Sequence, residues 1–193
     1  MVIGLTSFSV NEDTSYTGSL NATANEIVTL NYVIDSSTSN GTLTLSSNGG
    51  ILYNPNADFF GTDEFQYSVT AVEKSVTKTA TVNITVNSVN DKPEISFTTL
   101  SGLSKNTLVH ETSQTFEIRV SDKDNQIEDI TFDILIGAQT IAGNFVLDES
   151  STVQGDGQLT FDLSNLENGG LYNAQIRASD GVDSSSISFE SWF

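Results

Sequence analysis

The chain has 193 residues, which is room for one large domain or two small ones. It carries 25 acidic residues against 7 lysines and arginines, and the formal net charge of −18 argues against binding to nucleic acid or to an anionic membrane surface. Cysteine is absent, which excludes disulfides, zinc–thiolate sites and thiol catalysis, and the single histidine, His110, excludes a histidine-rich metal site.

Alternation of apolar and polar residues predicts strands along most of the chain. Apolar side chains occupy every second position in the segments 65–71, 80–86, 116–120, 130–136 and 172–178. A period of two with one apolar face is typical of half-buried strands, and the threonine-rich opposite faces suit strands better than helices. Clusters of Gly, Asn, Asp and Ser separate these short segments, which is a rhythm typical of β-sandwiches.

Pro93 marks the predicted boundary between two domains. It is one of only two prolines, and it ends the polar stretch 87–92 that follows a strong strand pattern. Proline donates no ladder hydrogen bond and holds the preceding Lys92 extended, so this stretch should form a stiff joint. We therefore predict two β-sandwiches in series, residues 1–91 and 92–193.

The chain shows no segment that would place it in a membrane. No apolar run approaches the ~18–20 residues of a membrane span, so we expect no direct membrane insertion. Residues 1–14 have no basic region and no long apolar stretch, and they do not form a secretory signal. If the parent protein is exported, we expect this chain to be a fragment whose export signal lies elsewhere.

The sequence lacks the common enzyme motifs, and we predict that the chain is not an enzyme. His110 is the sole imidazole and lies beside Glu111 in a polar segment, where a surface role is expected. No Gly-x-Ser-x-Gly elbow and no glycine-rich phosphate loop is present. A glycosidase pair among the 25 carboxylates stays open, because nothing in the sequence singles out two of them.

Acidic residues gather in short clusters near predicted strand ends, namely Glu12-Asp13, Asp63-Glu64, Asn90-Asp91, Asp122-x-Asp124-Asn125 and Asp180. Each acid taken alone is expected to be a solvated loop residue. Taken together, the set favours calcium, because this ion takes ~6–8 oxygen ligands and its charge offsets the repulsion between crowded carboxylates. The segment that begins at Asp122 is not an EF-hand loop. Its sixth position is Ile127 where that loop needs glycine, and its twelfth is Asp133 where that loop needs glutamate.

Several stretches resemble the bacterial cadherin-like and Ig-like tandem repeats of large surface adhesins and RTX-type proteins. The resemblance covers nearly all of residues 10–93, through NEDT at 11–14, GTLTL at 41–45, YNPNADFFGTDEFQY at 53–67 and VNDKP at 89–93. The second half resembles the group through Asp122-Lys-Asp124 and Ala178-Ser-Asp180. The resemblance implies an all-β fold of two Ig-like or cadherin-like Greek-key β-sandwiches in tandem.

In cadherins calcium is held at the joint between consecutive domains, and the resemblance implies a matching ligand set. The first domain would supply a glutamate near the end of its first strand, an acidic pair before a late strand and an Asn-Asp linker. The next domain would supply an Asp-x-Asp and an Ala-x-Asp. The implied Ca²⁺ ligands are Glu12, Asp63, Glu64, Asn90, Asp91, Asp122, Asp124 and Asp180.

The other end of the first domain departs from the pattern of these repeats. They usually carry an Asn-Asp-x-Asp stretch after the glycine of the second strand, but here Gly18 is followed by no acid until Glu26. Ala71 stands where an aspartate is usual. We therefore expect the calcium joint between the two domains and not toward an upstream neighbour.

The resemblance implies a calcium-stiffened spacer or adhesion module that lies outside the cell or on a bacterial cell surface. We expect a monomer whose partners are neighbouring repeats of the same parent chain and a cell-surface protein or a glycan. The alternative is a β-sandwich that binds a carbohydrate or protein ligand without a structural metal, which exposed aromatic residues would favour. Most aromatic residues lie on inward strand faces, and the pattern leaves open Tyr53, Phe59, Phe60, Trp192 and Phe193.

Overall fold

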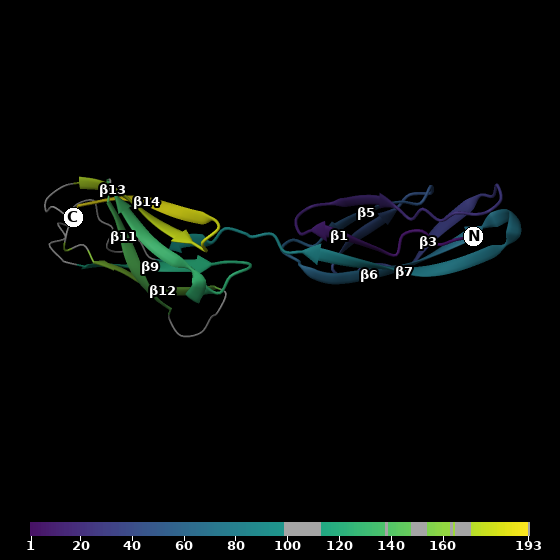
Figure 1. Ribbon diagram of the computed structural model, residues 1–193. Coiled ribbons are helices and arrows are strands. Elements are labelled where there is room, and N and C mark those ends of the chain that lie inside the picture. Colours follow the sequence, from purple (N-terminus) through teal and green to yellow (C-terminus); the bar gives the residue numbers. More distant parts are fainter. Residues whose placement is uncertain (99–112, 138, 148–153, 163, 165–170, 193) are drawn as a thin grey trace. The chain divides into compact units, whose positions relative to one another are not determined.

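The computed structural model describes residues 1–98, 113–137, 139–147, 154–162, 164 and 171–192. The chain divides into two compact units, Met1–Val89 and Asn90–Phe193 (Figure 1). Each unit has its own hydrophobic core. The boundary predicted from the sequence lies two residues later, so Asn90 and Asp91 are described with the second unit. The predicted all-β fold class is confirmed, because the described elements are strands and two short 3₁₀ turns.

The first unit is a β-sandwich of two sheets. One sheet has the strand order β1-β7-β6-β3 and the other β2-β5-β4, with β1 parallel to β7 and the other neighbours antiparallel. Sheet neighbours that are not consecutive in the chain give the expected Greek-key connectivity. The strands are β1 (Ser7–Asn11), β2 (Tyr16–Ser19), β3 (Leu30–Ser36), β4 (Gly41–Leu45), β5 (Gly50–Pro55), β6 (Gly61–Ala71) and β7 (Val76–Asn87), with the 3₁₀ turn η1 (Val72–Lys74) between the last two.

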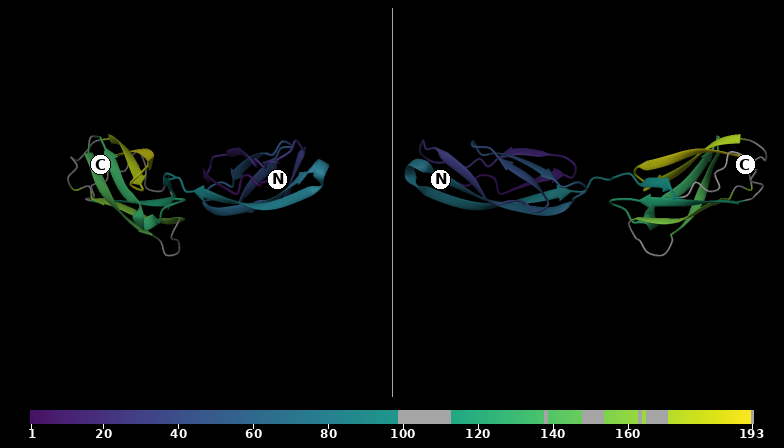
Figure 2. Two further views of the ribbon diagram at one scale, coloured as in Figure 1. Left: turned by 45° about the vertical axis from the view of Figure 1, so that its right-hand side comes forward. Right: turned by 180° about the vertical axis from the view of Figure 1, so that it is seen from behind.

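Strict alternation along β6 and β7 builds the core of this unit. Phe65, Tyr67 and Val69 of β6 are fully buried, whereas the residues between them are exposed or half-buried on the outer face. Tyr53 of the opposite sheet covers them, together with Leu20, which directly follows β2, and both are also fully buried. β6 and β7 together form the long twisted ribbon that is visible in all three ribbon views (Figures 1 and 2).

The second unit is built from one continuous sheet with the order β14-β13-β10-β11-β12-β9-β8. Its two edge strands meet, since Phe189 of β14 lies with its ring centroid 5.7 Å from Phe97 of β8 and 5.1 Å from Phe116 of β9. The sheet is therefore folded over a shared core. The strands are β8 (Glu94–Phe97), β9 (Ser113–Ser121), β10 (Thr131–Ile136), β11 (Gln139–Leu147), β12 (Gln154–Asp162), β13 (Leu171–Ser179) and β14 (Ser184–Trp192), with the 3₁₀ turn η2 (Ile127–Asp129) before β10.

Close packing around β11 depends on a glycine. Gly143 pairs with Phe132 of β10 and with Phe161 of β12. A Cβ atom at this position would lie 2.4 Å from Cε1 of Phe161 and 2.8 Å from Cδ1 of Leu159, which is too close for either side chain to stay in place. A residue without a side chain thus lets the fully buried Phe161 and Leu159 fill the core.

Candidate metal centre

Acidic and amide side chains gather at one end of the second unit, the end at which β8 begins. β8 and β9 are antiparallel, and Glu94 at the start of β8 lies opposite Ser121 at the end of β9. The residues before β8 and those after β9 therefore lie at the same end of the sheet. β13 ends there too, and its turn into β14 brings further acids. We call this group the β8-end cluster; it comprises Asn90, Asp91, Asp122, Asp124, Asp180 and Asp183.

Asp122 is the most buried member of the β8-end cluster, with only 5% of its surface exposed. Its Oδ1 accepts hydrogen bonds from the backbone N–H groups of Asp124 (2.9 Å) and Asn125 (2.7 Å) and from the Asn125 side chain. Its Oδ2 is buried and has no hydrogen-bond partner. A buried carboxylate oxygen without a donor is costly, and a bound cation is one way to compensate it.

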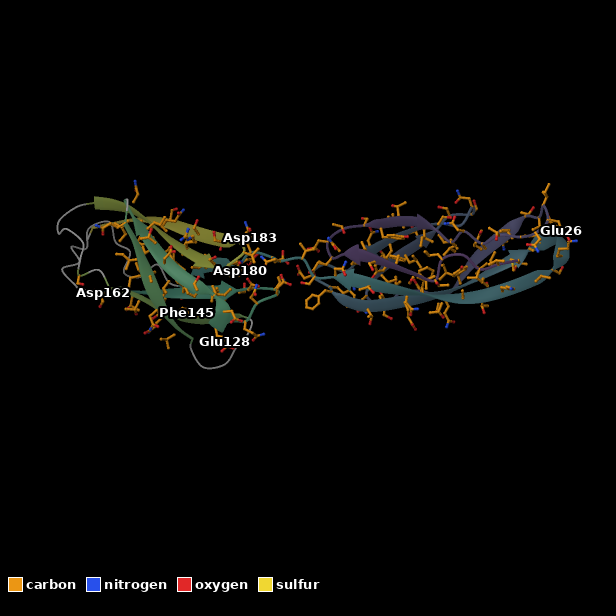
Figure 3. All side chains as sticks on the ribbon, in the orientation of Figure 1. Glu26, Glu128, Phe145, Asp162, Asp180 and Asp183 are labelled. Atoms are coloured by element: carbon orange, nitrogen blue, oxygen red, sulfur yellow. The ribbon has the colours of Figure 1, made fainter. Side chains whose placement is uncertain are left out.

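Linker residues are tied to this cluster within the second unit. The backbone N–H of Asp91 donates to Oδ2 of Asp124 at 2.7 Å. The Asn90 side-chain nitrogen donates to Oδ2 of Asp180 at 3.0 Å and to Oδ2 of Asp183 at 3.3 Å. Asp180 and Asp183 lie side by side in the turn between β13 and β14 (Figure 3). The hydrogen bonds thus place five of the eight residues predicted from the sequence at one end of the second unit, and their role as cation ligands stays a prediction.

Hydrogen bonding keeps Asp180 in its charged form. Its Oδ1 accepts the backbone N–H groups of Val182 and Asp183, each at 2.7 Å. Desolvation pushes the pKa of Asp180 upward, but the donors from Asp183, Val182 and Asn90 outweigh it, and that pKa lies below its ordinary value. The carboxylate is therefore available to a cation at neutral pH.

Glu12 lies where the last strand of the first unit ends. It is 2% exposed, its backbone N–H donates to the Asn87 carbonyl, and its Oε1 accepts the backbone N–H of Val89 at 2.7 Å. The next residue, Asp13, is exposed, and its Oδ1 accepts the backbone N–H of the exposed Asp58 at 3.3 Å. Both Asp13 and Asp58 have a φ of 55°, a conformation that aspartate tolerates better than most residues. The buried carboxylate of Glu12 thus holds the final residue of this unit.

The side chains of Asp63 and Glu64 point to opposite faces of β6. Adjacent strand residues point to opposite faces, so Asp63 is 7% exposed on the inner face of β6 and Glu64 is exposed on the outer face. Both oxygens of Asp63 are engaged: Oδ1 by the backbone N–H groups of Ser39 and Glu64, and Oδ2 by the Asn40 N–H and the Tyr53 hydroxyl. These contacts give Asp63 a structural role, and its role as a cation ligand stays a prediction.

At its other end the first unit is held by direct protein contacts. Lys74 Nζ lies 2.7 Å from Oε2 of Glu26, which is labelled in Figure 3. Glu73 accepts the backbone N–H and the hydroxyl of Thr29 at 2.8 and 2.7 Å. These hydrogen bonds hold the pKa of Glu73 below its ordinary value. In the described part of the chain, this is also the end at which the sequence leads us to expect no calcium.

Sequence reasoning missed Asp183 as a candidate ligand. A signal was available, because the Asp180-Gly181-Val182-Asp183 turn returns the chain three residues later to the first aspartate, and Gly181 has a φ of 92° that suits such a turn.

His110 lies outside the described residues, as do Phe193 and the side chain of Trp192. Of the other aromatic residues left open, Tyr53 is fully buried, Phe59 packs on the core and Phe60 is 51% exposed.

Comparison with known families gives a match in the first unit. Residues 2–88 match the family model of the bacterial cadherin-like domain, which confirms the resemblance stated for the first half of the sequence. The comparison with curated proteins gave no match. Among the described residues, no helix has the length and apolar character to cross a bilayer.

Solved structures with some likeness to the chain include two pieces of titin and a hydrolase. An I-band fragment of titin is 13% identical, with 99% of this chain and 63% of that chain covered and a TM-score of 0.43. Titin domains Z1Z2 in complex with telethonin are 10% identical, with coverages of 98% and 92% and a TM-score of 0.37. An endo-fucoidan hydrolase from glycoside hydrolase family 107 is 14% identical with a TM-score of 0.39, and this chain covers 27% of its length.

Proposed function

Because residues 2–88 match the bacterial cadherin-like domain, we propose that the chain is a calcium-stiffened spacer or adhesion module of a bacterial surface or secreted protein. Domains of this kind are typically extracellular, non-enzymatic and calcium-binding. The proposal adds that the ion is held where the two units are joined. Its partners would be neighbouring repeats of an RTX-type adhesin and a protein or glycan on another surface.

The side chains present fit a calcium ion. Ca²⁺ takes ~6–8 oxygens from carboxylates, amides and carbonyls, and all predicted ligands are of these types. The second unit would contribute Asn90, Asp91, Asp122, Asp124 and Asp180, and the first unit Glu12, with Asp63 and Glu64 as further members of the predicted set. The observation that carries the proposal is the buried Oδ2 of Asp122, which lacks a protein donor.

The proposed mechanism follows from the charges of these residues. Without a cation, the carboxylates that the two units would contribute would repel one another, and the joint would bend freely. A bound ion supplies the positive charge that both sets of oxygens require. If residues of both units bound the same ion, bending at the joint would cost metal ligands, and the joint would become stiff.

Thermal unfolding of the whole chain in CaCl₂ and in EDTA tests the proposal. Extracellular calcium modules bind with Kd of roughly 10⁻⁴–10⁻³ M, and free calcium at a hundred times Kd adds about 2.7 kcal/mol per site to the stability of the folded state. We expect the melting temperature to rise in CaCl₂, and Asp122→Asn to abolish most of that rise.

A matched control is Asp162→Asn, which removes the same charge. Asp162 is labelled in Figure 3 at the opposite end of the second unit from Asp180 and Asp183. It caps the backbone N–H of Ser164, a contact that asparagine can retain. This variant should keep the full calcium response. Superimposable melting curves of the unmodified chain in CaCl₂ and EDTA would refute calcium binding.

A further inference from the structure

The linker is held at both sides by protein contacts that involve no metal. In the first unit, Oε1 of Glu12 accepts the backbone N–H of Val89 at 2.7 Å. In the second unit, the Asn90 side chain and the Asp91 N–H each donate to carboxylates of the β8-end cluster. The residues that make these contacts, Val89 and Asn90, are adjacent in the chain, so only a few backbone dihedral angles separate the two contacts.

The Asn90 contact has a particular chemistry. Its amide nitrogen lies between two carboxylate oxygens, 3.0 Å from Oδ2 of Asp180 and 3.3 Å from Oδ2 of Asp183. The same nitrogen also lies 3.3 Å from the Asp91 carbonyl oxygen, so its two N–H groups are shared among three acceptors, of which Oδ2 of Asp180 is the nearest. Each N–H carries a partial positive charge, and together they weaken the repulsion between the two acids, as a cation at that place would do more strongly.

We infer that the Asn90 amide group holds the place of a cation between Asp180 and Asp183 in the metal-free protein, and that Asp183 is a further ligand of the calcium site. The Asn90 side chain would then offer calcium its amide oxygen, because its N–H groups cannot bind a cation. The ligand role of Asp183 rests on the proposed function. The hydrogen bonds from the Asn90 side chain to Asp180 and Asp183, which we call the Asn90 clasp, do not. The buried Oδ2 of Asp122, which has no hydrogen-bond partner, is a separate observation that favours a cation at this end of the second unit.

Two substitutions separate the clasp from the ligand role. Asn90→Asp replaces the donor with a third carboxylate, so it breaks the clasp but keeps an oxygen for calcium. Asp183→Asn keeps an oxygen that accepts the Asn90 N–H, so it preserves the clasp but removes a negative charge from the ion site. Asp162→Asn at the far end of the unit again serves as the charge control.

The first measurement is hydrogen exchange of residues 89–91 in EDTA on the whole chain. Loss of hydrogen bonds to charged groups should raise the exchange rate in Asn90→Asp by about tenfold or more. Asp183→Asn and Asp162→Asn should exchange like the unmodified chain. An Asn90→Asp variant that exchanges like the unmodified chain in EDTA would overturn the clasp, whether or not the protein binds calcium.

The second measurement is calorimetric titration with CaCl₂. Asp183→Asn should weaken calcium binding about tenfold and Asn90→Asp should strengthen it, because ligand charge sets calcium affinity. Wild-type affinity in Asp183→Asn would overturn its ligand role. If the unmodified chain takes up no calcium, the ligand role fails together with the proposed function, and the exchange experiment still decides the clasp.

Discussion

The contact between Tyr53 and Asp63 yields the sharpest stability prediction for the first unit. Tyr53 is fully buried in β5, and its hydroxyl donates to Oδ2 of Asp63 at 2.9 Å. Asp63 in turn holds the loop before β4 through the backbone N–H groups of Ser39 and Asn40. Replacing Tyr53 with phenylalanine removes one buried hydrogen bond to a charged group and leaves the loop contacts in place.

The expected loss follows from the type of bond. A hydrogen bond to a charged group contributes about 1.5–3 kcal/mol, so we expect Tyr53→Phe to cost about 2 kcal/mol. For a domain of this size that corresponds to a fall of about 8–16 °C in melting temperature. Burial, the hydrogen bond to Asp63 and the charge of Asp63 also raise the pKa of Tyr53 well above its ordinary value of 10.0.

The raised pKa makes the loss depend on pH. The unfolded chain releases the Tyr53 proton near pH 10, whereas the folded chain retains it, so the stabilisation is complete below pH 10 and declines as the pH rises further. At pH 11 the contribution should have fallen by about 1.4 kcal/mol. The difference between the unmodified chain and Tyr53→Phe should therefore narrow from about 2 kcal/mol at pH 8 to below 1 kcal/mol at pH 11.

The quantity to measure is the difference in unfolding free energy between the unmodified chain and Tyr53→Phe. It is obtained from urea unfolding at several pH values, with hydrogen exchange of β5 and β6 as the readout for this unit. A stability gap that stays constant from pH 8 to pH 11 would refute the argument, as would a Tyr53→Phe variant as stable as the unmodified chain.

Three further predictions concern metal binding and packing. Asp91→Ala should lose most of the rise in melting temperature that CaCl₂ produces; an unchanged rise would move the ion elsewhere. Asp63→Asn should lower the stability of the first unit equally in CaCl₂ and in EDTA if its role is structural, and a larger loss in CaCl₂ would make it a ligand. Gly143→Ala should cost the second unit about 1–3 kcal/mol in urea unfolding, because its Cβ would overlap Phe161; no loss would contradict the packing described for β11.

Local periodicity was sufficient to predict five of the strands. The alternating segment 65–71 lies within β6, 80–86 within β7, 116–120 within β9 and 172–178 within β13. Alternation depends only on which residues face the core, and that information is local. It does not specify which strands pair. The continuous sheet of the second unit depends on pairing between distant segments and on the ring contacts of Phe97 and Phe189, which the pattern along one strand does not reveal.

The candidate site was predictable in part for the same reason. The acids of the β8-end cluster follow strand ends, and Asp-x-Asp and Ala-x-Asp are recognisable from sequence alone. Asp63 differs, because the donors that engage it come from Ser39, Asn40 and Tyr53, which no motif links to it. For Asp183 the Asp180–Asp183 turn was a local signal, but its closeness to Asn90 arises only in the folded protein.

Small-angle X-ray scattering of the whole chain during a calcium titration tests the central claim most directly. If residues of both units bind the same ion, saturating CaCl₂ should narrow the distribution of interatomic distances relative to EDTA, and Asp122→Asn should keep the broader, metal-free distribution. Scattering profiles that superimpose with and without calcium, from a chain that calorimetry shows to be calcium-loaded, would contradict the claim that the ion stiffens the joint.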